Sequence, residues 1–377
     1  MLIGIDASSA AKPMRTGVEQ YAFQLIEALK KLPLGTDQVR LYSPAKLSAP
    51  LDALPTGWES RVLSWPLAHA WMRARVGMEM LAHAPDVLFV PSQGLPFFSP
   101  RKKGKRTVTT IHDIGFLRVP ALYDSHVVAR TRAVTHRAVH LADHLITVSE
   151  FSKQELMNAY HIPVDRITVT PLAADTTFFH PLPASDVARV RDGYRLGPHY
   201  FLVVGRVEKK KNPLTAIEAF AIFKAHRGAG DPFELVFAGS PGFSFDEVKK
   251  YLEFHPQRER VHFLFHVDGD EIVALMNGAT AVLCPSFYEG FGLTNLEALA
   301  CGTPVIASDI PPHREVAGDA ALFASPQAPE QWTEAMHRLA DDTVLHSTLR
   351  ARGLERATKF SWEKTAETTL AVLKSTS

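Results

Sequence analysis

Two glutamates, Glu289 and Glu297, are separated by seven residues within the segment 284–302, CPSFYEGFGLTNLEALACG. Gly290 and Gly292 follow the first glutamate, and because glycine has no Cβ they let backbone amides approach a ligand closely. A helix expected just beyond them would add unpaired N–H groups and a positive dipole end, which suit a diphosphate. The segment therefore predicts a ligand-binding loop, in which Glu289 has no obvious structural duty.

Glu297 also has a structural interpretation. The spacing Thr294-x-x-Glu297 matches a capping box at the start of a helix from about Thr294 to Cys301, and Gly302 could end that helix. The ligand-binding and capping interpretations of Glu297 are equally open at this point.

A second candidate segment, VVGRVEKKKN at 203–212, places Arg206 and Lys211 between an expected strand and an expected helix. A guanidinium and an ammonium group there can neutralise two phosphates and stabilise a nucleoside-diphosphate leaving group. Lys209 and Lys210 are interpreted as a solvated charge run. The register of Lys211 with Arg206 favours a functional role for Lys211.

His112 stands at the end of an expected strand, next to Asp113. A histidine in this position could be a purely structural residue that its neighbour hydrogen-bonds, and without further context that interpretation is favoured.

Asp268-Gly-Asp270 has an Asp-x-Asp spacing with which some enzymes bind a divalent metal. The helical pattern EIVALM follows immediately, so an N-cap turn explains the two carboxylates. We therefore predict no metal site and no cofactor.

Short β-branched runs alternate with longer amphipathic stretches, which predicts parallel α/β layers. The expected strands lie near 2–6, 38–43, 86–90, 107–111, 144–148, 166–170, 200–205, 234–238, 261–265, 280–284 and 304–307. The predicted fold is α/β, with two Rossmann-like, doubly wound domains that face a central cleft. Because ligands of such sheets bind beyond the carboxyl ends of the strands, the candidate motifs stand where a site is expected.

The chain of 377 residues is long enough for two domains. A proline-bearing stretch interrupts the periodic pattern after the last strand of the first half. The predicted division is a first Rossmann-like domain at 1–175, a linker at 176–198, a second Rossmann-like domain at 199–357, and a C-terminal helix at 358–377 that packs back on one of the domains.

Lys and Arg number 41 against 40 Asp and Glu, so the net charge of +1 gives no attraction to nucleic acid. The two cysteines, Cys284 and Cys301, lie in apolar runs and are expected to be reduced core thiols. No apolar run approaches the ~20 residues that span a bilayer, and the N-terminus does not match a signal peptide. A cytoplasmic protein is expected, with possible peripheral contact at the inner face of the membrane.

Together, GRVEKKKN and PSFYEGFGLTNLEALACGTPVIAS strongly resemble the retaining glycosyltransferases of family 4, which have the GT-B fold. Weaker matches extend the resemblance over nearly the whole chain: Thr16-Gly17, TIHDIGF at 110–116, VSEFSKQEL at 148–156, EVAGDAALF at 315–323 and FSWEK at 360–364. The short Arg206-to-Lys211 spacing resembles the branch that glycosylates cell-surface polysaccharides, often with mannose or rhamnose.

The resemblance implies that the domain at 1–175 is the acceptor side, that the domain at 199–357 binds the donor, and that the C-terminal helix packs on the first domain. It also implies a role for each candidate residue. Glu289 and the segment Gly290, Phe291, Gly292 and Leu293 would hold donor-sugar hydroxyls, and Glu297 would bind the ribose. Arg206, Lys211 and the Gly17 backbone would hold the diphosphate, and the main chain of Val267 would contact the base. His112 would contact the donor sugar, which reverses the structural interpretation given above; Glu289 and His112 would be the catalytic residues.

The implied reaction is metal-independent transfer of a hexose, most simply mannose from GDP-mannose, with retention of configuration. The acceptor would be a growing polysaccharide or a lipid-linked glycan. The same fold with a UDP- or dTDP-sugar is the alternative enzyme, and a non-catalytic glycan-binding or scaffold protein is the alternative from another class. A degenerate relative would be expected to lose Arg206, Lys211 or Glu289, and all three are present.

Two segments of the first half could contact a membrane or an anionic acceptor. They are the basic run 101–106 and the aromatic and basic group Trp65, Trp71, Met72, Arg73 and Arg75. A solvated loop explains the first equally well, and helical core packing explains Trp71 and Met72.

Overall fold

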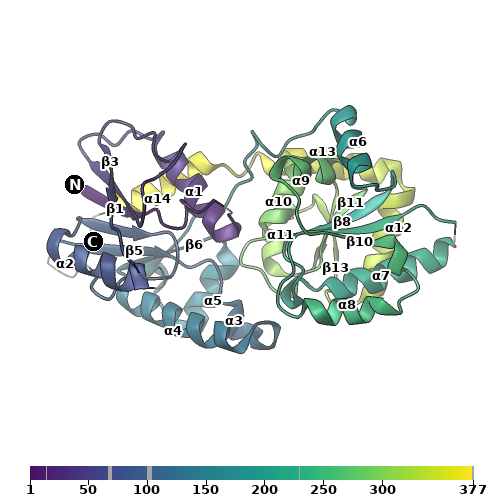
Figure 1. Cartoon of the computed structure of the whole chain (residues 1–377), viewed down its shortest axis with the longest axis horizontal. Helices are drawn as coiled ribbons and strands as arrows, with labels where there is room; N and C mark the ends of the chain where they lie inside the picture. The colour runs from purple at the N-terminus through teal and green to yellow at the C-terminus, as the bar shows by residue number, and fades with distance from the viewer. Residues whose placement is uncertain (14, 67–69, 100–103, 229, 376–377) are drawn as a thin grey trace. The chain divides into compact units, whose positions relative to one another are not determined.

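The computed structural model describes residues 1–13, 15–66, 70–99, 104–228 and 230–375, which divide into two compact units (Figure 1). Unit 1 consists of Met1–Arg118, Ser125–Leu172 and Ser361–Ser377. Unit 2 consists of Val119–Asp124 and Ala173–Phe360. Each unit contains one wholly parallel sheet.

The sheet of unit 1 has seven strands in the order β3-β2-β1-β4-β5-β6-β7. They are β1 (Leu2–Asp6), β2 (Gln38–Ser43), β3 (Trp58–Val62), β4 (Val87–Val90), β5 (Arg106–Thr110), β6 (His144–Thr147) and β7 (Ile167–Val169). The helices are α1 (Gly17–Leu29), α2 (Gly77–His83), α3 (Gly115–Arg118), α4 (Ser125–Leu141), α5 (Glu150–Tyr160) and α14 (Trp362–Lys374), with a π-helical turn at Trp71–Val76 before α2. Helix α14 packs against α1, and the Arg106 side chain donates to the carbonyls of Val372 and Leu373.

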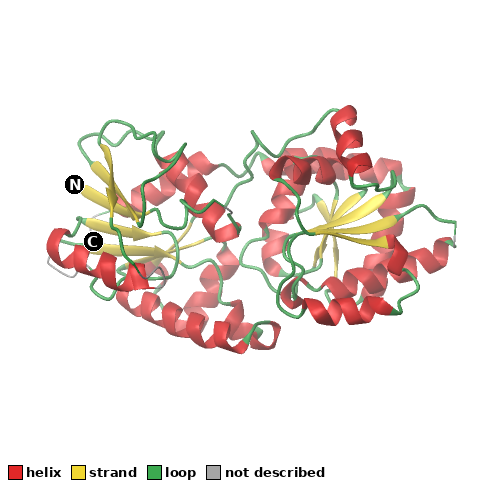
Figure 2. Ribbon diagram, viewed as in Figure 1, coloured by secondary structure: helices red, strands yellow, loops and turns green. Residues whose placement is uncertain are grey.

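The sheet of unit 2 has six strands in the order β10-β9-β8-β11-β12-β13. They are β8 (Tyr200–Val204), β9 (Glu234–Ala238), β10 (Val261–Leu264), β11 (Ala281–Cys284), β12 (Val305–Ser308) and β13 (Ala321–Ala324). The helices are α6 (Ala184–Gly193), α7 (Pro213–Arg227), α8 (Phe245–Glu253), α9 (Gly269–Gly278), α10 (Leu293–Ala300), α11 (Pro311–Ala317), α12 (Pro329–Asp341) and α13 (Thr343–Ala357). Figure 2 shows helices on both faces of each sheet, which explains why strands such as β4 and β11 are buried along their whole length.

The two parallel sheets confirm the predicted α/β, doubly wound architecture. Two strands were not predicted from the sequence, β3 and β13, each at one edge of its sheet. In β3 only Trp58 is buried, so WESRV lacks the apolar run of an inner strand, and in β13 only the first and last of the four residues are buried. The range 176–198, predicted as a linker, contains α6 and lies in unit 2.

In unit 2 the chain runs from β8 to β9 on one side, and β11 pairs with β8 on the other. The loops that follow β8 and β11 therefore leave neighbouring strands at the carboxyl edge of the sheet. This reversal of strand order is the place where doubly wound sheets bind ligands.

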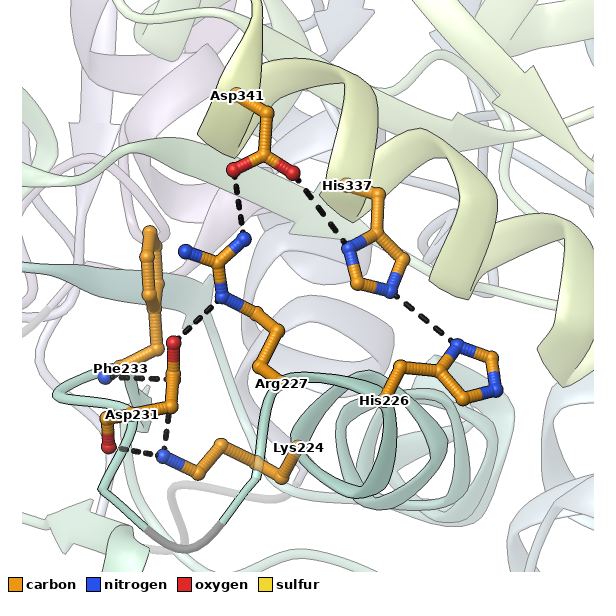
Figure 3. Close-up of polar contacts among 7 residues, drawn as sticks. All are labelled: Lys224, His226, Arg227, Asp231, Phe233, His337 and Asp341. Atoms are coloured by element: carbon orange, nitrogen blue, oxygen red, sulfur yellow. Dashed lines mark hydrogen bonds and ion pairs between the residues drawn. The ribbon is translucent and has the colours of Figure 1, made fainter.

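At the opposite, amino edge of this sheet, an ion-pair network with a buried centre joins α7, α12 and the turn before β9 (Figure 3). Asp231 accepts from Lys224 Nζ at 2.9 Å and from the Phe233 amide at 3.0 Å, and it pairs with Arg227. Arg227 also pairs with Asp341 at 2.6 Å. These contacts fix the end of α7 against the sheet and against α12.

Candidate functional site

The loop after β8 is held against the loop after β11. Asn212, in the left-handed region at φ 55°, donates from Nδ2 to the carbonyls of Pro285 at 3.1 Å and Pro326 at 2.7 Å. The Phe287 amide donates to the Lys210 carbonyl at 3.0 Å. These bonds fix the two loops to each other and so bring Lys211 to Glu289.

Lys211 and Glu289 form an ion pair, with 2.6 Å between Nζ and Oε1. Ser286 Oγ donates to the same carboxylate oxygen at 2.8 Å. Burial alone would raise the pKa of Glu289, but the charges of Lys211 and Lys210 outweigh it and hold the pKa well below its usual range. Glu289 is therefore ionised at any working pH and acts only as a hydrogen-bond acceptor.

The pKa of Glu297, unlike that of Glu289, is raised. Burial raises its pKa to about 8, and the charge of Lys211 offsets this only in part. Near neutral pH the Glu297 carboxyl group is therefore mostly protonated. Two glutamates eight positions apart thus differ in ionisation, because only Glu289 has an ammonium group within bonding distance.

The capping-box interpretation of Thr294 and Glu297 is wrong. Helix α10 begins at Leu293, and its N-cap is Gly292 in the left-handed region at φ 100°. Thr294 is already inside the helix, and Glu297 lies one turn further on. Gly302, at φ 72°, follows the C-cap Cys301 as predicted.

The raised pKa of Glu297 gives a pH-dependent stability. Between pH 4.5 and 8 the folded state holds a proton that the unfolded chain has lost, so stability falls as pH rises, by up to about 1.4 kcal/mol per pH unit. Glu297→Gln should abolish this component and be more stable than the wild type at pH 8.5. Urea unfolding of the wild type and of Glu297→Gln at pH 5 and pH 8.5 measures this pH-dependent contribution. An equal loss of stability between the two pH values in both proteins would contradict the prediction.

His313 and Asn295 are buried beside Lys211 and Glu289, and neither was predicted from the sequence. His313 Nδ1 lies 3.1 Å from the Ser308 carbonyl, which can only accept, so Nδ1 carries the proton and Nε2 keeps its lone pair. Burial lowers the pKa of His313 to about 4, so the ring is neutral. An added Cβ at Gly292 would lie 2.8 Å from the His313 ring and 3.0 Å from Asn295 Nδ2, which leaves room only for glycine.

These residues line one small cavity. Lys211, Ser286, Glu289, Gly292, Asn295 and His313 all face it. No sequence motif could have identified His313, because it reaches the cavity from α11, after β12, and not from the loops that carry the motifs.

The other predicted donor-binding residues of unit 2 lie on the same edge. Arg206 is 62% exposed and pairs with Glu208 at 3.3 Å, so the structure does not join it to Lys211 or Glu289. Val267 is half-buried between β10 and α9. Phe291 is buried with its ring edge-on to Phe360, while Gly290 is buried and Leu293 begins α10.

In unit 1, Gly17 begins α1 and His112 follows β5. The His112 ring lies edge-on to Tyr21 of α1 at 4.7 Å. Its Nε2 is 3.1 Å from the Pro91 carbonyl, so Nε2 donates and Nδ1 is the free acceptor. Burial lowers the pKa of His112, so a neutral imidazole is expected. An added Cβ at Gly17 would meet nothing within 4 Å.

The N-cap interpretation of Asp268 is confirmed. Asp268 caps α9, and Glu271 returns a hydrogen bond to the Asp268 amide at 3.1 Å. Among the described residues no cluster of three or more His, Cys, Asp or Glu side chains could hold a metal ion. Cys284 and Cys301 are buried free thiols, and burial raises the pKa of each to about 12.

The structure describes only part of the first candidate segment for membrane or acceptor contact, and it places Trp71 of the second in the core. Residues 101–103 of the basic run lie outside the described chain, and Lys105 is occupied by the Ala84 carbonyl and Asp86. Trp71 is a core residue whose Nε1 donates to the Leu63 carbonyl at 2.6 Å. No helix in the described part of the chain has the length and apolar character to cross a bilayer.

Two family profiles match the chain. Residues 187–359 match "Glycosyl transferases group 1" and residues 15–178 match "Glycosyltransferase Family 4". The O-antigen chain mannosyltransferase B of Escherichia coli is 29% identical, over 98% of this chain and 99% of that protein. A D-inositol 3-phosphate glycosyltransferase of Acidothermus cellulolyticus is 29% identical, over 91% of this chain and 73% of that protein.

Solved structures with the same fold cover essentially the whole chain. The sucrose-phosphate synthase of Thermosynechococcus elongatus gives a TM-score of 0.75 at 18% identity, with 99% of this chain and 98% of that chain covered. HepE of Anabaena, solved in complex with UDP-glucose, gives 0.74 at 17% identity, with both chains fully covered. These likenesses show the GT-B fold.

Proposed function

Because this chain belongs to the group 1, family 4 glycosyltransferases, we propose that it transfers mannose from GDP-mannose to a growing polysaccharide or lipid-linked glycan, with retention of configuration. The observation that carries the proposal is the Lys211–Glu289 ion pair at the carboxyl edge of β8 and β11. The choice of mannose is supported by the similarity to the O-antigen chain mannosyltransferase.

In this proposal the chemistry follows from the charge states of the site. Lys211 and Arg206 bind the diphosphate and stabilise the charge that develops as it leaves. Glu289, always ionised, accepts hydrogen bonds from donor-sugar hydroxyls and cannot be a general acid. Glu297, with its raised pKa, binds the ribose and gives up its proton when the carboxylate accepts the ribose hydroxyls. As the family resemblance implies, the Gly17 backbone contacts the diphosphate, His112 contacts the donor sugar, and the main chain of Val267 contacts the base.

A UDP-sugar is the second candidate donor, because a structure of similar fold, HepE, holds UDP-glucose. A thermal-shift series with GDP-mannose, UDP-glucose, and dTDP- and ADP-sugars distinguishes the donors. A selective ligand at 100 times its Kd should add about 2.7 kcal/mol of stability. Proton NMR of the product then reads the anomeric configuration, and an inverted linkage would overturn the retaining mechanism.

The proposed reaction needs no metal ion. Turnover should be unchanged in excess EDTA, because Arg206 and Lys211 supply the positive charge that a cation would otherwise provide. Assays with EDTA alone and with EDTA plus Mn²⁺ or Mg²⁺ check this expectation. Loss of turnover that Mn²⁺ or Mg²⁺ restores would refute it.

A further inference from the structure

The amide group of Asn295 is buried without a hydrogen-bond partner. Asn295 lies in the first turn of α10, is 0% exposed, and lines the same cavity as Lys211 and Glu289. Among the described residues, neither its Oδ1 nor its Nδ2 has a hydrogen-bond partner. Burying a polar group costs free energy unless a hydrogen bond replaces those it made to water. An amide with both ends unpaired in a cavity therefore indicates a polar group that binds there.

Another asparagine of unit 2 shows the bonds that a structural role provides. Asn277 donates from Nδ2 to the carbonyls of His180 and Val273, and its Oδ1 accepts from the Leu182 amide. Both ends of that amide group thus hold the backbone together. Asn295 forms no such bonds, so packing alone does not explain why a polar side chain stands at this position.

His313 presents a second hydrogen-bonding group to the same space. Its Nε2 lies 3.4 Å, and Asn295 Nδ2 lies 3.0 Å, from one point, the Cβ position at Gly292. Because Nδ1 donates to the Ser308 carbonyl, Nε2 offers a lone pair. One small space therefore has an amide donor, an amide acceptor and a ring acceptor along its wall.

The size of the cavity limits what it can bind. Its volume of about 20 Å³ admits one oxygen-sized group and excludes a sugar ring. It reaches the surface at the ion pair, where the Lys211 and Glu289 side chains are 26% and 13% exposed. A hydroxyl group suits this wall, because it donates one hydrogen bond and accepts two, whereas a carboxylate cannot donate to the His313 ring.

We propose that Asn295 and His313 bind one hydroxyl group of the donor sugar, so that the cavity selects donors that carry a hydroxyl at that position. The hydroxyl accepts from Asn295 Nδ2 and donates to His313 Nε2, while the sugar ring stays outside the cavity. Glu289 has a different role, since its Oε1 already accepts from Lys211 and Ser286. The inference rests on the proposed function, because it requires a nucleotide sugar at this edge of the sheet.

The test is calorimetric titration of the full chain with GDP, GDP-mannose and monodeoxy analogues of GDP-mannose that lack the hydroxyl at carbon 2, 3, 4 or 6. The wild type should bind one analogue at least about tenfold more weakly than GDP-mannose, because the missing hydroxyl leaves Asn295 and His313 unpaired. Asn295→Ala should bind GDP-mannose about tenfold more weakly than the wild type does and should no longer distinguish that analogue from it. Its affinity for GDP should be unchanged.

A second variant and a matched control accompany this comparison. His313→Phe keeps a ring but removes the Nε2 acceptor, so it should lose the same discrimination between GDP-mannose and that analogue. Asn277→Ala is the control, because Asn277 bonds to backbone groups outside the cavity. It should keep the wild-type ratio of GDP-mannose affinity to GDP affinity. Melting temperatures show that each variant folds.

The outcomes separate this inference from the proposed function. Equal losses of GDP and GDP-mannose affinity in Asn295→Ala would show that Asn295 only supports the fold of the site and would overturn the inference. Wild-type discrimination among the analogues in both variants would overturn it as well. If the wild type binds UDP-glucose and not GDP-mannose, the proposed donor is wrong, and the same titrations with UDP, UDP-glucose and its monodeoxy analogues decide the inference. A wild type that binds no nucleotide sugar would overturn both.

Discussion

Glu289→Gln is expected to lower kcat by one to two orders of magnitude while nucleotide affinity stays the same or rises. Glutamine keeps the size of the side chain but removes its charge, and a lost charge-assisted hydrogen bond costs about 1.5–3 kcal/mol. Lys211, released from its 2.6 Å ion pair, keeps its positive charge for the diphosphate. Steady-state kinetics, with calorimetric titration of GDP-mannose and GDP, separates the two effects.

Two other variants are controls for this prediction. Ser286→Ala removes the 2.8 Å hydrogen bond to Glu289 but leaves the ion pair, so it should cost less than Glu289→Gln. Lys211→Met leaves a buried carboxylate without its cation, so it should weaken both nucleotide binding and stability. A Glu289→Gln enzyme with wild-type kcat, or one that loses only nucleotide affinity, would show that Glu289 does not act on the reacting sugar.

The sequence predicted those residues of the site whose place follows from their position just after a strand. Arg206, Lys211 and Glu289 stand in the connections directly after strands, and Glu297 stands in the helix that follows one of them. Parallel strands bring such connections to one edge of a sheet. The α/β fold could be predicted for the same reason, because its inner strands are continuous apolar runs. The predicted edge does contain the Lys211–Glu289 pair.

What the sequence could not predict depends on contacts distant along the chain. His313 lines the same cavity as Lys211 and Glu289, and Asn212 donates to the carbonyls of Pro285 and Pro326. Only the folded chain brings these residues together. The opposite pKa shifts of Glu289 and Glu297 depend on the distance of each carboxylate from one ammonium group. The capping-box error has a local cause, because glycine at 292 adopts a left-handed conformation and starts the helix earlier than the Thr–Glu pattern indicates.

Asp231→Ala is expected to destabilise unit 2 by about 3–5 kcal/mol, the cost of removing one partner from a buried ion pair. The substitution leaves the Lys224 ammonium, only 3% exposed in its side chain, with the Asp231 carbonyl as its remaining partner in the network of Figure 3. It also removes the acceptor of the Phe233 amide and one of the two partners of Arg227. Calorimetric unfolding of the wild type and the variant measures the loss.

The same network supplies the control, because its outer carboxylate, Asp341, is 56% exposed. Asp341→Ala breaks the 2.6 Å bond to Arg227 in contact with water, so it should cost at most about 1 kcal/mol. Adding Lys224→Met to Asp231→Ala should recover part of the stability, because the double variant no longer buries an unpaired cation. Nucleotide binding by the folded Asp231→Ala protein should persist, since the network lies at the opposite edge of the sheet from Lys211. A double variant less stable than Asp231→Ala alone would mean that Lys224 stabilises α7 through its packing and its bond to the Asp231 carbonyl rather than through the ion pair.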